Sequence, residues 1–130
     1  LCEILSIHQE QKPEYRLILA QAIPRLPRLE YILEKAVELG ATEIWLFPAT
    51  FSEKKEFSSS QMQRISHILI SATKQCGRLF LPKLSIMSSL FSWEASYLPT
   101  SSFFGDTNPK ALHLIEEFYD VFPKNTKTKN

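Results

Sequence analysis

The sequence predicts an α/β domain with a mainly parallel sheet and flanking helices. Two apolar runs of strand length, residues 15–23 and 42–47, enclose an amphipathic run of helical spacing at residues 28–39. A strand, a helix and a second strand in this order form a crossover unit, which joins parallel strands. Further segments of both kinds follow, and such alternation is typical of a parallel sheet.

The first predicted strand, residues 15–23, reads YRLILAQAI and is almost continuously apolar. This pattern is typical of a strand buried on both faces, as in a parallel sheet. Pro24 and Pro27 follow the strand and prepare a helix, because proline is tolerated in the first turn but not in a helix interior.

In the predicted helix, residues 28–39, apolar side chains recur at three- and four-residue steps while the charged side chains face away. Gly40 follows, where a residue in the left-handed conformation commonly ends a helix. The second predicted strand, TEIWLF at residues 42–47, ends at Pro48.

The middle of the chain predicts a second helix and a short third strand. The core stripe of this helix consists of Met62, Ile65, Leu69, Ala72 and Cys76. A serine among residues 58–60 is expected to cap the helix through its hydroxyl, and Gly77 is expected to end it. Because Pro82 interrupts residues 79–86, a strand is expected only after the proline.

Three more elements are predicted in the last third of the chain. Residues 88–100 are expected to contain one or two helical turns. The SFFG segment at residues 102–105 is a candidate fourth strand. Residues 109–118 form a plausible helix, with Pro109 at its first position.

Composition limits the class of protein. Hydrophobic residues make up 44% and charged residues 22%, which is ordinary for a globular domain. A net charge of +1 neither demands nor excludes nucleic acid, because binding depends on a local basic face. No apolar run approaches a bilayer span of about 20 residues, and no signal peptide is visible. We therefore expect no membrane association. Cys2 and Cys76 lack metal-ligand spacing, so we expect no metal. Two thiols in a chain without an export signal indicate a reducing cytoplasmic location.

Several catalytic motifs are absent from the sequence. The three glycines, Gly40, Gly77 and Gly105, are too scattered for a phosphate-binding loop. The sequence contains no HExxH pattern and no GxSxG elbow. Cys76 fits the apolar stripe and is expected in the core rather than as a nucleophile.

Two segments carry candidate binding residues. Arg25 and Arg28 lie in the turn after a strand's carboxyl end, where open α/β sheets bind ligands, and two guanidinium groups can bind phosphate. They can equally be solvated loop residues. Lys35 lies about two turns further along the helix, either on the same face or in an exposed ladder with its glutamate neighbours.

The second segment is Gln75-Cys-Gly-Arg78, where a helix ends beside a strand. Gln75 can hydrogen-bond a base edge, and Arg78 can bind a phosphate. Alternatively, Arg78 neutralises the negative carboxyl end of a helix.

These segments resemble the RsmE family of SPOUT-fold methyltransferases. The match rests on Arg25, Arg28 and Glu30, on Lys-x-x-Glu-Leu-Gly at residues 35–40, and on Gln75, Arg78 and Pro82. The similarity covers about residues 15–106. It implies an S-adenosylmethionine-dependent enzyme that methylates N3 of a uridine in 16S ribosomal RNA or the small ribosomal subunit, and that forms a homodimer when intact.

The resemblance also implies site residues and domain bounds. Arg25, Arg28, Lys35, Gln75 and Arg78 are the expected RNA contacts, and Gly105 and Asp106 the edge of a donor pocket. Residues 1–14 are expected to be a linker or the last strand of an N-terminal RNA-binding domain. Residues 15–122 are then a partial SPOUT domain, and residues 123–130 a polar tail or linker.

The sequence departs from the family pattern in two places. A family Glu-Arg pair is replaced by Glu53-Lys54, displaced by one residue. The Gly-Pro-Glu-Gly-Gly and Leu-Arg-x-Glu-Thr motifs of the donor-binding knot do not occur. These 130 residues are therefore expected to be inactive alone. A non-catalytic RNA-binding or dimerising module on the same fold, and a small-molecule enzyme on a flavodoxin-like sheet, are the alternatives.

Overall fold

The computed structural model describes residues 3–7, 9, 11–50, 56–93, 101–105 and 108–110. The chain divides into two compact units, Leu1–Ser92 and Trp93–Asn130. The first unit contains all the helices and strands of the described residues. These elements are β1 (Ile18–Ala22), α1 (Leu26–Glu38), β2 (Glu43–Phe47), α2 (Ser59–Gln75), β3 (Lys83–Ile86) and a short 3₁₀ helix, Leu90–Ser92.

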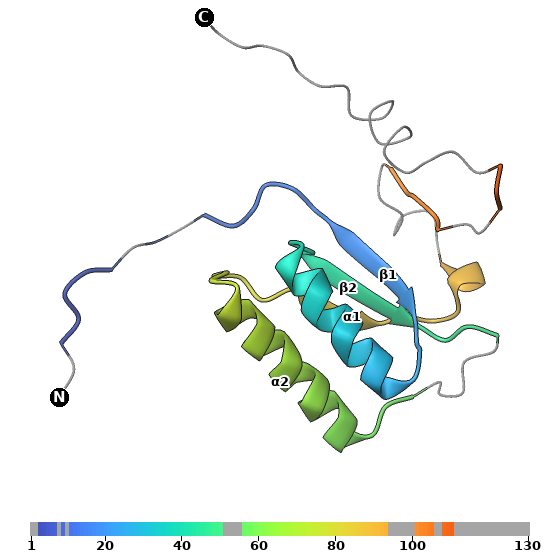
Figure 1. Ribbon diagram of the computed structural model, residues 1–130, viewed down its shortest axis with the longest axis horizontal. Coiled ribbons are helices and arrows are strands. Elements are labelled where there is room, and N and C mark those ends of the chain that lie inside the picture. Colours follow the sequence, from blue (N-terminus) through green and yellow to red (C-terminus); the bar gives the residue numbers. More distant parts are fainter. Residues whose placement is uncertain are drawn as a thin grey trace, which may run out of the picture. The chain divides into compact units, whose positions relative to one another are not determined.

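The three strands form a parallel sheet in the order β1-β2-β3. Ile44 at the centre of β2 pairs with Leu19 on one side and Leu84 on the other. Helices α1 and α2 lie side by side and pack against the sheet from the same side (Figure 1). The predicted α/β class with parallel strands is thus confirmed.

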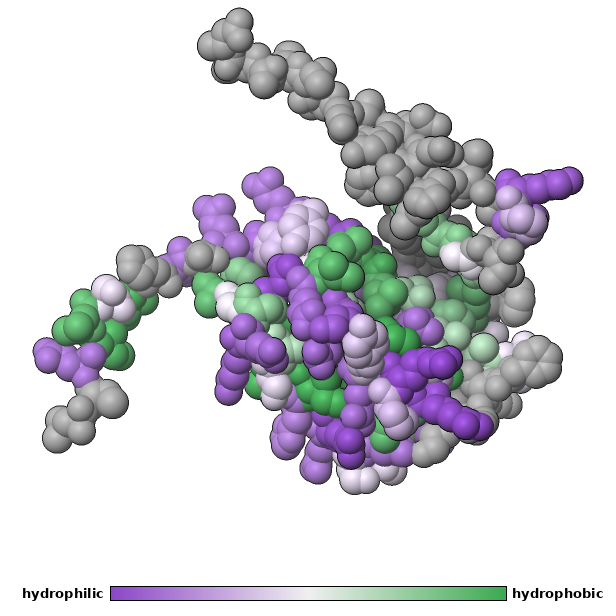
Figure 2. Space-filling model, in the orientation of Figure 1, coloured by the Kyte–Doolittle hydropathy of each residue, from purple (hydrophilic) through white to green (hydrophobic). Residues whose placement is uncertain are grey.

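The core lies between the sheet and these two helices. Ile44 and Leu46 of β2 are fully buried there together with Leu29 and Leu33 of α1 and Ile65 of α2. Burial of each such side chain stabilises the fold by about 1.5–3 kcal/mol. On the opposite, solvent-facing side of the helices, hydrophilic residues alternate with narrower apolar areas (Figure 2).

Local signals place the helix ends as expected. Pro27 lies in the first turn of α1, and Gly40 follows the helix with a φ of +91°. Helix α2 begins with a capping box, in which the Gln61 amide donates to Ser58 Oγ (3.3 Å) and the Ser58 amide donates to Gln61 Oε1 (3.0 Å). Strand β3 begins at Lys83, directly after Pro82, as predicted.

Three sequence predictions are wrong. Strand β1 is half-buried rather than buried on both faces, because it is an edge strand with both helices on one side of the sheet. Residues 102–105 form no strand and are exposed. Cys76 is exposed, because α2 ends at Gln75 and its apolar stripe ends with it.

The last predicted elements are described only in part. The 3₁₀ helix Leu90–Ser92 supplies the helical turn expected within residues 88–100. Pro109 and Lys110 form a turn, in which the Lys110 amide donates to Asn108 Oδ1 at 3.0 Å. Residues 111–118 of the predicted helix lie outside the described residues, as do Glu53 and Lys54.

Candidate nucleic-acid interface

Arg25 and Arg28 lie at the carboxyl edge of the sheet, as the sequence predicts. Strand β1 ends at Ala22, and Arg25 is the N-cap residue of α1. Both arginine side chains are exposed, and no acidic residue lies in the first turn of α1. Arg28 forms no ion pair with any residue that the structure describes. The positive end of the helix dipole and two guanidinium groups therefore favour an anion at this edge.

Lys35 is engaged within α1. Its ammonium group lies 2.9 Å from a carboxylate oxygen of Glu38 and 3.2 Å from one of Glu34, and 5.6 Å from the centre of the Tyr31 ring. Hydrogen bonds to Glu38 and Glu34 raise the pKa of Lys35. The lysine thus takes part in the charge ladder that was one of its two predicted arrangements.

Arg78 contacts the end of a helix, but not the helix that precedes it. Its guanidinium donates to the backbone carbonyl of Glu38, with 3.0 Å between Nη2 and O. This carbonyl belongs to the last turn of α1, which has no intrahelical partner for its terminal carbonyls. Arg78 therefore joins the carboxyl end of α1 to the loop between α2 and β3.

The structure separates the five predicted RNA contacts into two groups. Helix α1 runs from the carboxyl to the amino edge of the sheet. Lys35 lies two helical turns after Arg28, which places the two residues about 10 Å apart along the helix axis. Gln75, which is exposed, is the last residue of α2, and Arg78 follows the helix at the amino edge. Only Arg25 and Arg28 thus share one edge with each other and with the predicted ligand position.

An open groove runs along α2. It has a volume of about 420 Å³, and Gln75 lies at one end and Ser60 at the other. Arg64 lines it and forms an ion pair with Glu30 of α1, with 2.5 Å between Nε and Oε1. The acidic residue of the family pattern, Glu30, therefore links α1 to α2.

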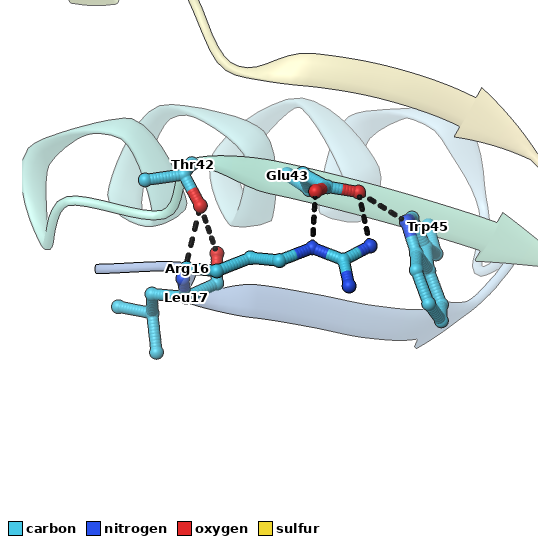
Figure 3. Close-up of polar contacts among 5 residues, drawn as sticks. All are labelled: Arg16, Leu17, Thr42, Glu43 and Trp45. Carbon is cyan, nitrogen blue, oxygen red and sulfur yellow. Dashed lines mark hydrogen bonds and ion pairs between the residues drawn. The ribbon is translucent and has the colours of Figure 1, made fainter. Parts of the chain in front are cut away.

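A polar cluster that the sequence motifs did not predict lies on the other face of the sheet (Figure 3). Arg16 Nε donates to Glu43 Oε1 at 2.6 Å, and Trp45 Nε1 donates to Glu43 Oε2 at 3.0 Å. The hydrogen bond from Arg16 has the largest effect on Glu43 and lowers its pKa, and the hydrogen bond from Trp45 lowers it further. Glu43 and Trp45 alternate with Ile44 and Leu46, which pack against the helices, and this alternation is the sequence signal that could have placed Glu43 and Trp45 on the opposite face of β2.

Arg16 and Glu43 also line a larger groove at the amino edge of the sheet. Its volume is about 980 Å³, and its walls come from residues 11–16, 40–43 and 77–83. Arg78, Lys12 and Lys83 contribute further positive charges. No pattern in the sequence links these three segments, because they are brought together only by the sheet.

Of the two residues predicted at the edge of a donor pocket, only Gly105 lies among the described residues. Gly105 is exposed, and a Cβ atom added there would meet no atom within 4 Å. Asp106 lies outside the described residues. Within the described ranges, no group of His, Cys, Asp or Glu could hold a metal ion, and no helix is long and apolar enough to cross a membrane.

Comparison with known families identifies the class of protein. Residues 10–120 match the family model described as an RNA methyltransferase domain. This match covers most of the chain. The chain therefore belongs to this RNA methyltransferase domain family.

Individual relatives define the family more closely. Over 78 residues the chain is 30% identical to ribosomal RNA small subunit methyltransferase E of Buchnera aphidicola, and over 91 residues 32% identical to that of Helicobacter pylori strain J99. These alignments cover 58% and 68% of the chain. The chain belongs to the RsmE-type RNA methyltransferase family.

Solved structures support this assignment. The chain is similar to a predicted RNA methyltransferase from Thermotoga maritima, with a TM-score of 0.55 and 32% identity over 63% of the chain. It is also similar to ribosomal RNA small subunit methyltransferase E from Neisseria gonorrhoeae bound to S-adenosyl methionine, with a TM-score of 0.52 and 29% identity over 58% of the chain.

The chain spans only part of these proteins. It covers 31% and 40% of the Buchnera and Helicobacter relatives, and 36% and 31% of the two solved structures. Its three parallel strands and two helices therefore correspond to part of a SPOUT-fold methyltransferase.

Proposed function

We propose that the protein containing these residues transfers a methyl group from S-adenosylmethionine to N3 of a uridine in 16S ribosomal RNA. Membership of the RsmE-type family is the observation that carries this proposal. The uracil N3 carries a proton, which a general base must remove before or during attack, a contribution on the order of 10²–10⁴-fold. We assign that base to none of the described residues.

In this proposal, Arg25 and Arg28 hold RNA phosphate at the carboxyl edge of the sheet. Their support is exposure, the nearby helix N-terminus and the lack of acidic residues in the first turn of α1. Gln75 is exposed and can reach a base edge. Lys35 would have to exchange its Glu38 contact for a phosphate, and Arg78 would have to use the N–H groups that do not bind Glu38.

The proposal also covers the donor and the assembly. The 130 residues lack both donor-binding motifs of the family, so the isolated chain is expected to transfer no methyl group. The whole protein is expected to act as a homodimer in the cytoplasm, where ribosomal RNA is found.

Binding of the isolated chain to a small-subunit ribosomal RNA fragment tests the RNA contact. We expect Arg28→Glu to weaken binding about tenfold at low salt, since a charge-assisted contact is lost. Glutamate in the first turn of a helix interacts favourably with its dipole, so the fold is retained. Lys110→Glu, which also reverses an exposed charge, is the control. Equal affinity of Arg28→Glu and wild type would contradict the assignment of Arg28.

A further inference from the structure

The groove at the amino edge of the sheet has the chemistry of a nucleic-acid site. Four cationic side chains line it, those of Lys12, Arg16, Arg78 and Lys83. Two carboxylates, Glu14 and Glu43, oppose them, which leaves a net formal charge of +2. The whole chain carries only +1, so this groove concentrates its positive charge.

The charges of the groove are not equivalent. Glu43 is held by Arg16 and Trp45, so these two opposite charges largely cancel. Lys12 and Lys83 are exposed and make no ion pair with any of the residues described. Lys83 acts on Glu43 only through its charge, as the smallest of the causes that lower the pKa of Glu43. Both ammonium groups are thus available to an anionic ligand in the groove.

An aromatic ring lies among these cations. Tyr15 is 54% exposed, and its hydroxyl lies 3.5 Å from the Gly40 carbonyl oxygen, which anchors one end of the side chain. Leu79 and Leu81, on the facing loop, are 62% and 52% exposed. Exposed aromatic and apolar side chains between lysines provide stacking surfaces for unpaired bases alongside contacts for phosphates.

We propose that this groove binds single-stranded RNA, as a second contact remote from Arg25 and Arg28. The inference rests on the proposed function, because family membership is what makes RNA the expected polyanion. Lys12 and Lys83 contact phosphates, and the Tyr15 ring stacks on a base. Arg78 fixes the groove wall by holding the end of α1 through the Glu38 carbonyl.

The salt dependence of binding counts the phosphate contacts. The probe is a labelled single-stranded oligouridine, titrated with the chain between about 50 and 200 mM salt. Each lost contact should reduce the slope of log affinity against log salt by about 0.7. Lys12→Gln and Lys83→Gln should each do so, and the double variant should lose about 1.4. Lys110→Gln, an exposed lysine of the other compact unit, should leave the slope unchanged.

Two variants of Tyr15 test base stacking. Tyr15→Phe keeps the ring and should retain affinity, whereas Tyr15→Leu should weaken binding about tenfold. Lys12 lies outside every helix and strand, so its variant reports on binding even if substitution of Lys83 disturbs the sheet.

The outcomes separate the two proposals. If wild type binds no RNA, this inference and the assignment of Arg28 both fail, whereas methyl transfer by the whole protein is tested separately by deleting its gene. If binding depends on Arg28 but not on Lys12, Lys83 or Tyr15, the proposed function stands and the groove is not an RNA site. If the double lysine variant loses self-association in sedimentation while its RNA affinity is unchanged, a second copy of the chain occupies the groove and this inference is overturned.

Discussion

At the scale of single residues, Gly40 is constrained both by its backbone conformation and by a neighbouring side chain. Its φ of +91° lies in a region that favours glycine. It also lies beneath a neighbouring side chain, because a Cβ atom added there would come within 2.9 Å of Arg78 Nη2. The glycine of the Leu-Gly pattern therefore allows both the end of α1 and the approach of Arg78.

Gly40→Ala should destabilise the fold by about 2 kcal/mol or more, because backbone strain adds to the displacement of Arg78. Urea unfolding of the isolated chain measures this change. Gly77→Ala is the matched control: Gly77 has a φ of +67° but open space around it, so only the backbone cost of about 1 kcal/mol is expected. Equal costs at both positions would show that the contact with Arg78 is unimportant.

Glu43 makes the stability depend on pH. Its pKa is lowered by the hydrogen bonds from Arg16 and Trp45. A carboxyl group with a lowered folded pKa stabilises the fold above its unfolded value, near 4.5, and this contribution disappears as the pH falls through the folded pKa.

Glu43→Gln should therefore reduce stability by about 1 kcal/mol near neutral pH and have little effect in strong acid. Unfolding by urea at several pH values checks this difference. The control is Glu56→Gln, since Glu56 is exposed and pairs with no cation among the described residues. A Glu43→Gln effect that stays constant down to strong acid would contradict the assigned role of the carboxylate.

At the scale of elements, periodicity and end signals predicted most of the described structure. Both helices, all three strands of the sheet and the proline before β3 follow from local patterns. The wrong predictions share one cause. A sequence pattern shows which residues are apolar, but it does not show which other elements pack against them. Residues 102–105 are apolar enough for a strand but form none, and the two described helices both cover the same side of the sheet that contains β1.

The capping box of α2 gives a prediction at this scale. Ser58→Ala removes the acceptor for the Gln61 amide and should cost about 1 kcal/mol. Thermal unfolding followed by circular dichroism measures the change. Ser66→Ala, on an exposed turn of the same helix, should be neutral or slightly stabilising because alanine has the higher helix propensity. Equal effects of the two substitutions would rule out a special role for the cap.

At the scale of the whole molecule, the candidate site was less predictable than the fold. Arg25 and Arg28 were placed correctly at the carboxyl edge, because the end of a strand can be located in the sequence. The hydrogen bond from Arg78 to Glu38, and the position of Lys12 and Lys83 around one groove, depend on contacts between distant segments. Family motifs marked Arg78 as important but did not reveal that its guanidinium holds α1.

The central claim is that the protein containing this chain methylates uridine N3 in 16S ribosomal RNA. The most direct test is to delete its gene in the source organism and measure 3-methyluridine in purified 16S ribosomal RNA by mass spectrometry of nucleosides. We predict that this nucleoside disappears and returns when the complete reading frame is restored, but not when the 130 residues alone are expressed. Unchanged 3-methyluridine after deletion would contradict the account, and its recovery with the 130 residues alone would contradict the expected inactivity of the isolated chain.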